Sequence, residues 1–256
     1  MTEAQVLAFV LVVTRVTTFV AFFTLFSFRQ LPLLIKIGIS VSLSVFWFGE
    51  TENAGLPSLE NIGMVDSFLL LGREFGIGLM LCTALNLFFM PCKVAGAYVG
   101  QEMGLSLASL SNPGTPDSAT LVTRIFETFT VLIFFSLDLH HFLIMAVDFS
   151  FQHVTNNFSI MLFPTEQLVS MLNSSSDYGL MVIAPLALIL MIVTLSLSLL
   201  NRAAPTLNLF SVGIGVRAGF GIFCIAMLTP VIFGALRGYL QHIQSNVEQF
   251  LMLFQG

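Results

Sequence analysis

Charged residues are scarce in this chain of 256 residues. Only 9% are Asp, Glu, Lys or Arg, compared with about 25% in soluble globular domains. The basic residues form no cluster and the net charge of -5 is small and dispersed, which argues against a nucleic-acid partner. The three cysteines, Cys82, Cys92 and Cys224, each lie in apolar sequence without disulfide or metal-ligand spacing. No G-x-S-x-G motif, P-loop or internal repeat is present, so these motifs give no support to an enzyme.

Apolar residues, by contrast, make up 56% of the chain, and 27 of them are phenylalanine. The mean hydropathy is +0.94. Three uncharged runs, Tyr178–Asn201, Ala218–Leu236 and Phe75–Cys92, have 24, 19 and 18 residues, against roughly 20 needed to cross the hydrocarbon layer. Because lipid offers no hydrogen-bond partners, such runs fold as helices. We therefore predict an all-α, hydrophobic, multi-helix membrane-associated protein with long kinked helical hairpins.

The apolar pattern also predicts where the helices lie. The first stretch follows Glu3 rather than a basic region, which indicates a retained helix and not a cleaved signal peptide. An acidic loop with Glu50, Glu52 and Glu60 and a polar linker at 173–177 interrupt the apolar pattern. The expected segments are 4–28, 32–48, 65–90, a Gly-rich piece at 92–110, a helix from a cap at Asp117 or Ser118 to about 147, an amphipathic piece at 147–161, two long runs at 178–200 and 206–235, and a C-terminal amphipathic helix at about 236–254.

Several charges interrupt these apolar runs, at a cost of roughly 2.5 to 3.5 kcal/mol each on insertion scales. They include Arg15, Glu74 and Arg217, and Arg124 stands three residues before Glu127 on one helical face. One interpretation is an ion or proton relay; the other is pairing between helices or subunits. Because no carboxylate ladder or repeated spacing appears, we predict buried charge pairing for Arg124, Glu127 and Arg217.

Glycines recur every four residues at three places, which lets helix backbones approach closely. The predicted packing positions are Gly96, Gly100, Gly215 and Gly219. Glycine is also easily unwound from a helix, so the segment ending at Gly104 fits either close packing or conformational switching. Both interpretations stay open at this stage.

Asp138-Leu-His140-His141 is the only stretch that fits a membrane metalloenzyme. It lacks the i, i+4 histidine pair of a helical zinc site, and His153 is twelve residues further on. We therefore predict no metal, no cofactor and no catalytic residue, and we expect replacement of both histidines by Asn to leave the function largely intact.

Three blocks of sequence together carry a family resemblance. They are Val99-Gly-Gln-Glu-Met-Gly-Leu-Ser-Leu-Ala-Ser-Leu with the Asn112-Pro113 turn, Arg124 and 135–142 after it; Asn201-Arg-Ala-Ala-Pro-Thr-Leu-Asn-Leu-Phe-Ser-Val-Gly213; and Arg73-Glu74-Phe75-Gly76-Ile-Gly78. In their order along the chain, and over nearly its whole length, these blocks resemble the FliR/SctT family of type III export-gate proteins. The resemblance implies a single export-gate domain over 1–256 that is not an enzyme.

The same resemblance implies the partners and the location. A family member assembles with small hydrophobic FliP-like and FliQ-like subunits and a FlhB-like switch protein into a spiral export gate. Unfolded flagellar proteins pass through that gate in the bacterial inner membrane at the flagellar basal body. Membrane lipid is a further contact, although much apolar surface is buried against partners. No nucleic acid is expected.

The resemblance places a plug in the segment from about 103 to 118, which is apolar, holds no charge before Asp117 and ends on two prolines. Here it contains no phenylalanine, and methionine suits a deformable seal. The positions carried over are Met103, Gly104, Leu105, Leu107, Leu110, Asn112, Pro113, Gly114 and Pro116.

Two other functions compete with a flagellar export gate. The equivalent subunit of a virulence injectisome has the same physical requirements. A small-solute secondary transporter is expected to show paired broken helices in two related halves, and this chain has no such duplication.

Overall fold

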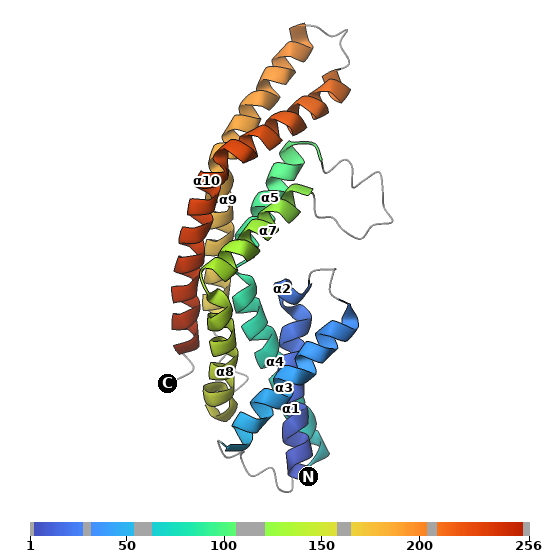
Figure 1. Cartoon of the computed structure of the whole chain (residues 1–256), viewed down its shortest axis with the longest axis vertical. Coiled ribbons are helices and arrows are strands. Elements are labelled where there is room, and N and C mark those ends of the chain that lie inside the picture. The colour runs from blue at the N-terminus through green and yellow to red at the C-terminus, as the bar shows by residue number, and fades with distance from the viewer. Residues whose placement is uncertain are drawn as a thin grey trace. The chain divides into compact units, whose positions relative to one another are not determined.

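The computed structural model describes residues 3–27, 32–53, 63–105, 121–157, 165–203 and 209–252. Within these ranges the chain is helical and contains no strand, which confirms the all-α prediction (Figure 1). The helices are α1 (Glu3–Phe22), α2 (Thr24–Ser27), α3 (Leu33–Asn53), α4 (Met64–Asn86), α5 (Met90–Glu102), α7 (Leu121–Ser136), α8 (Leu139–Asn157), α9 (Thr165–Ala203) and α10 (Leu209–Met252).

The chain divides into two compact units, each assembled from separate stretches of sequence. The first comprises Met1–Leu87, Asp138–Leu168 and Gln244–Gly256, and the second comprises Phe88–Leu137 and Val169–Ile243. In the first unit α1 packs against α3 and α4, and α8 contacts α3 and α4. Figure 1 shows α3 crossing α1. The single domain over 1–256 stays a prediction.

In the second unit, α5 packs along α7 over a core rich in phenylalanine. Phe134 stacks edge-on against Phe88 at 5.8 Å between ring centroids and tilts against Phe89 at 5.5 Å. The long helices α9 and α10 lie side by side (Figure 1), and the Tyr239 hydroxyl donates a hydrogen bond to Ser175 Oγ at 2.8 Å between them. Buried aromatic rings of this size supply much of the packing energy of such a core.

Two helices run through segments that the sequence predicted to be loops. α3 continues through Glu50 and Glu52 to Asn53 instead of ending in an acidic loop. α9 continues through the 173–177 linker, where the hydroxyls of Ser174, Ser175 and Ser176 donate to backbone carbonyl oxygens four residues earlier, at 2.8 to 3.1 Å. This bonding pattern lets polar serines sit inside a helix. The run of serines in this segment was therefore not a sign that the helix ends there.

Two other predicted boundaries are also corrected. α10 is continuous from Leu209 to Met252, so the expected amphipathic helix at 236–254 is its last part and not a separate element. Conversely, the helix expected to run to about 147 is interrupted between α7 and α8. Asp138 there adopts a left-handed backbone with φ of 56°, which a helix cannot contain.

Among the residues that the structure describes, four helices, α1, α4, α9 and α10, are long and apolar enough to cross a membrane, and α7 with α8 makes a fifth if that bent pair is one span. α9 has 39 residues and α10 has 44. At 1.5 Å per residue they are about 58 and 66 Å long, twice the ~30 Å of a hydrocarbon layer. Lipid therefore covers only part of either helix, even where the helix crosses the bilayer.

Candidate gate segment and buried charges

α5, the helix that leads into the predicted plug segment, packs closely against α7. A Cβ atom built on Gly96 would lie 2.4 Å from Thr123 Cα, which is backbone that cannot rotate away. Only glycine fits there, since any side chain forces the helices apart. Gly96 thus fixes the height and rotation of α5 against α7.

α5 ends in a glycine-terminated turn that the sequence left ambiguous between packing and switching. The backbone N–H of Gly104 donates to the Gln101 carbonyl at 2.9 Å, and that of Leu105 donates to the Gly100 carbonyl at 3.0 Å. Gly104 has a φ of +76°. This pair of bonds around a left-handed glycine is the Schellman arrangement, which satisfies the last carbonyls of a helix and stops it. Gly104 therefore terminates α5 from two residues beyond its last residue and directs the chain out of the helix.

Met103 is the first predicted plug residue, and the structure buries it. Its side chain is 0% exposed, and its Cγ, Sδ and Cε atoms lie 2.7 to 2.8 Å from where a Cβ on Gly221 of α10 would be. A flexible thioether fills this glycine gap well. In the single chain Met103 therefore anchors the start of the segment, and its role in a seal, which the resemblance implies, stays a prediction.

The structure describes only two of the other predicted plug positions. Gly104 and Leu105 are half-buried at the end of the turn. Leu107, Leu110, Asn112, Pro113, Gly114 and Pro116 lie outside the described residues. The plug assignment stays a prediction.

A buried ion pair joins three helices of the first unit. Arg15 Nε of α1 donates to Glu74 Oε2 of α4 at 2.6 Å, and Arg15 Nη1 donates to the Ser150 backbone carbonyl of α8 at 2.6 Å. The guanidinium carbon also lies 4.3 Å from the centre of the Phe151 ring. Arg15 is 1% exposed and Glu74 is 4% exposed. Because both charges are removed from solvent, each depends on the other.

The backbone of α1 comes close to α4 at this pair, since a Cβ on Gly78 would lie 2.7 Å from the Arg15 carbonyl oxygen. Sequence reasoning singled out Arg15 and Glu74 as costly charges but did not join them, because 59 residues separate them. Opposite charges within the apolar parts of two helices were the available signal. The pair agrees with the interpretation that such charges pair between helices, as the partners of Arg15 lie within the chain.

The three charges predicted to pair have different surroundings. Arg124 is exposed on α7 and Glu127 is half-buried, so pairing of these two stays a prediction. Arg217 of α10 is half-buried, and its Nε has no hydrogen-bond partner among the described residues. Gly215 and Gly219, on either side of it, have nothing within 4 Å of a built Cβ in the described part of the chain. This stretch of α10 leaves room for a neighbouring group.

Cys92 shows why the cysteines act as small core residues. It lies in α5, is 0% exposed and accepts a hydrogen bond from Thr130 Oγ1. Burial raises the pKa of the Cys92 thiol to about 12. Since the thiolate is the reactive form, this side chain is chemically inert at neutral pH.

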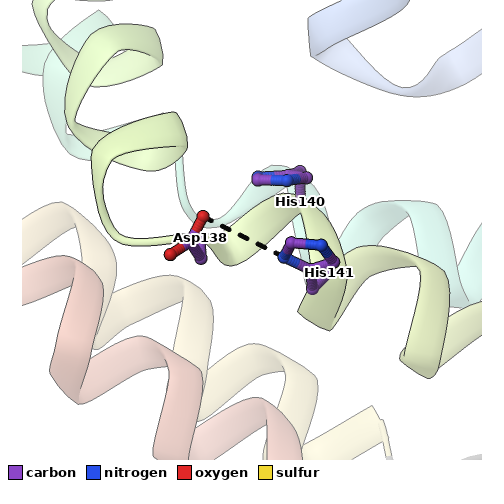
Figure 2. A group of neighbouring side chains, drawn as sticks. All are labelled: Asp138, His140 and His141. Atoms are coloured by element: carbon purple, nitrogen blue, oxygen red, sulfur yellow. Dashed lines mark ion pairs between the residues drawn. The ribbon is translucent and has the colours of Figure 1, made fainter.

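The side chains of Asp138, His140 and His141 lie close to one another at the start of α8 (Figure 2). One donor atom from each of Asp138, His140 and His141 lies within 4.8 Å of the others. His141 Nδ1 is 4.0 Å from Asp138 Oδ1, and the two imidazole rings are 4.1 Å apart at their centres. Helical spacing alone had indicated no ligand set here, because the left-handed backbone of Asp138 was not foreseen.

The long apolar helices, with their one deeply buried ion pair between α1 and α4 among the described residues, are those of a multi-helix membrane protein. The chain belongs to the family of bacterial export proteins, family 1, whose model matches residues 6–243. It is 27% identical over 251 residues to flagellar biosynthetic protein FliR of Bacillus subtilis, covering 96% of this chain and 95% of that protein. It is also 27% identical to FliR of Escherichia coli, covering 93% and 88% of the two chains, and 29% identical to Yop proteins translocation protein T of Yersinia pestis, covering 77% of each.

Proposed function

We propose that this chain is a structural and gating subunit of a flagellar type III protein-export apparatus, forming part of the channel through which unfolded flagellar proteins leave the cell. The observation that carries the proposal is its similarity to a FliR of Bacillus subtilis across almost the full length of both chains. The proposed location is the bacterial inner membrane, at the flagellar basal body.

The exposed apolar surface of the second unit supports assembly with other subunits. Only 22% of the apolar stretch Leu168–Ala203 of α9 and 28% of the apolar stretch Gly213–Gln249 of α10 is buried within the chain. Met181, Leu199 and Met227 are 72%, 69% and 69% exposed. Because these helices are about twice as long as the hydrocarbon layer is thick, lipid leaves much of this surface to be covered by protein. Small hydrophobic FliP-like and FliQ-like subunits and a FlhB-like switch protein are the proposed partners.

One stretch of α10 suits contact with a partner helix. Gly215 and Gly219 present an open surface where a second backbone can approach. Between them, the Nε of Arg217 has no hydrogen-bond partner among the residues that the structure describes. That nitrogen is itself buried within the chain, and an unsatisfied donor is costly away from water.

The proposed gate is the segment that follows Leu105. Its start is rigid, because Gly96 fixes α5 and the Gly104 turn stops the helix, and Met103 is clamped against α10. An apolar loop held at one firm end excludes water and ions from a narrow lumen by contact and can still be displaced by a passing chain. Closure is in this view a property of the loop.

An injectisome subunit is the second candidate, favoured by the 29% identity to a Yersinia pestis protein named for Yop translocation. Both candidates predict a non-enzymatic channel component. They differ in which proteins stop being exported when the chain is removed.

The test combines removal of the gene with affinity purification. We expect loss of motility and of hook and filament proteins from the medium, with recovery on expression of the intact chain. We also expect small hydrophobic membrane proteins to co-purify in mild detergent. Unchanged export of flagellar proteins in the deletion strain contradicts the proposal, and selective loss of virulence effectors assigns the chain to an injectisome.

A further inference from the structure

Asp138, His140 and His141 lie together at the first turn of α8 on the surface of the first unit (Figure 2). We propose that they bind one divalent transition-metal ion of the zinc class. This proposal is independent of the export function, because it depends only on these three side chains and the backbone that presents them. The ion has a structural role, holding the turn at the start of α8.

The chemistry of the donors selects the class of ion. Two imidazole nitrogens and one carboxylate oxygen suit Zn²⁺, Co²⁺ or Ni²⁺. Ca²⁺ and Mg²⁺ take oxygen ligands almost exclusively, so a site that is two-thirds nitrogen disfavours them. Three protein ligands leave a fourth tetrahedral position for water.

The ligand atoms need to move only slightly closer together to bind one ion. Ligand atoms in a tetrahedral zinc site lie about 3.4 Å apart, given metal–ligand bonds of roughly 2.0 to 2.1 Å. Here His141 Nδ1 and Asp138 Oδ1 are 4.0 Å apart, and no pair in the group exceeds 4.8 Å. The side chains of Asp138 and His141 are 77% and 71% exposed, so they can close by about 1 Å onto the half-buried His140 without displacing packed neighbours of their own.

The backbone explains why the carboxylate reaches the histidines. Asp138 has a φ of 56°, a left-handed conformation that Asp adopts more readily than most residues. The His141 backbone N–H donates to the Asp138 carbonyl at 3.0 Å and closes the turn. The geometry thus orients the Asp138 side chain toward His141 before any ion binds, and less ordering remains to be done on binding.

Co²⁺ is the probe of choice, because its visible absorption reports both binding and coordination geometry. The full chain is purified in detergent, with the subunits that accompany it, through a tag that contains no histidine. The variants are Asp138→Asn, His141→Asn and the double variant His140→Asn/His141→Asn. His242→Asn is the matched control, since His242 is also exposed but lies on α10.

We expect one Co²⁺ per chain with tetrahedral absorption bands that Zn²⁺ abolishes by displacement. Each single ligand variant is expected to weaken binding by at least about tenfold, because even supporting groups around a metal contribute 10- to 100-fold, and the double variant is expected to abolish it. His242→Asn is expected to bind as the wild type does. Equal binding by the wild type and the double variant overturns the proposal, and so does the absence of saturable binding.

Discussion

The buried pair of Arg15 and Glu74 allows the sharpest test of how the first unit is held together. We consider Arg15→Met, Glu74→Leu and the double variant, which replace the charges by apolar side chains. Removing one partner of a buried pair costs about 3 to 5 kcal/mol, because the remaining charge is left uncompensated. With Glu74 and Arg15 only 4% and 1% exposed, this range applies to both single variants.

The surroundings set the order of the two single variants. Glu74 keeps a second cation after Arg15→Met, since Arg73 Nη2 lies 3.7 Å from Glu74 Oε1. Glu74→Leu removes the carboxylate that balances Arg15, and the contacts of Arg15 that remain include the uncharged Ser150 carbonyl and Phe151 ring. Glu74→Leu is therefore expected to lower the free energy of unfolding by about 5 kcal/mol and Arg15→Met by about 3 kcal/mol, the two ends of the range of about 3 to 5 kcal/mol for such pairs.

The double variant separates pairing from simple loss of contacts. Apolar replacement of both partners is often close to neutral, so we expect it to be more stable than Glu74→Leu. The coupling energy is then at least about 3 kcal/mol, roughly a 100-fold change in the folding equilibrium constant.

Two measurements follow these variants: the amount of chain retained in membranes, and the temperature at which the detergent-solubilised complex loses solubility. Arg202→Met is the control, because Arg202 is exposed in the last turn of α9 and contributes at most about 1 kcal/mol there. If the single variants match this control, or if the double variant costs as much as the two singles combined, the reasoning is refuted.

Two further predictions concern the gate segment and its support. Deleting residues 106 to 115 is expected to leave the complex assembled but permeable to small ions when export is idle. Membrane conductance measures the leak, and co-purification of the partner subunits checks assembly. An assembled deletion variant that does not leak would falsify the plug assignment. Gly96→Ala is expected to cost about 1 to 3 kcal/mol by overpacking, since its Cβ would lie 2.4 Å from Thr123 Cα. Gly38→Ala, which has nothing within 4 Å, is expected to be neutral or stabilising by up to about 1 kcal/mol; equal thermal stability of the two variants contradicts close approach at Gly96.

Some features of the site were readable in the sequence because they are local. The glycines at 96 and 104 stood out by spacing, but spacing does not say what lies opposite. The structure assigns one to close helix contact and the other to helix termination. Met103 shows the same limit, since its burial against Gly221 joins positions 118 residues apart.

Composition by itself determined that the chain is an all-α membrane protein, because a long apolar run in lipid has to satisfy its own backbone hydrogen bonds. Three short blocks of sequence, read in order, determined the family. The tertiary structure alone decided that Arg15 pairs with Glu74, that the serines at 174–176 continue a helix, and that Asp138 turns toward two histidines. The physical reason is that each of these depends on a partner or a backbone angle set by packing at a distance, which no local pattern of residues encodes.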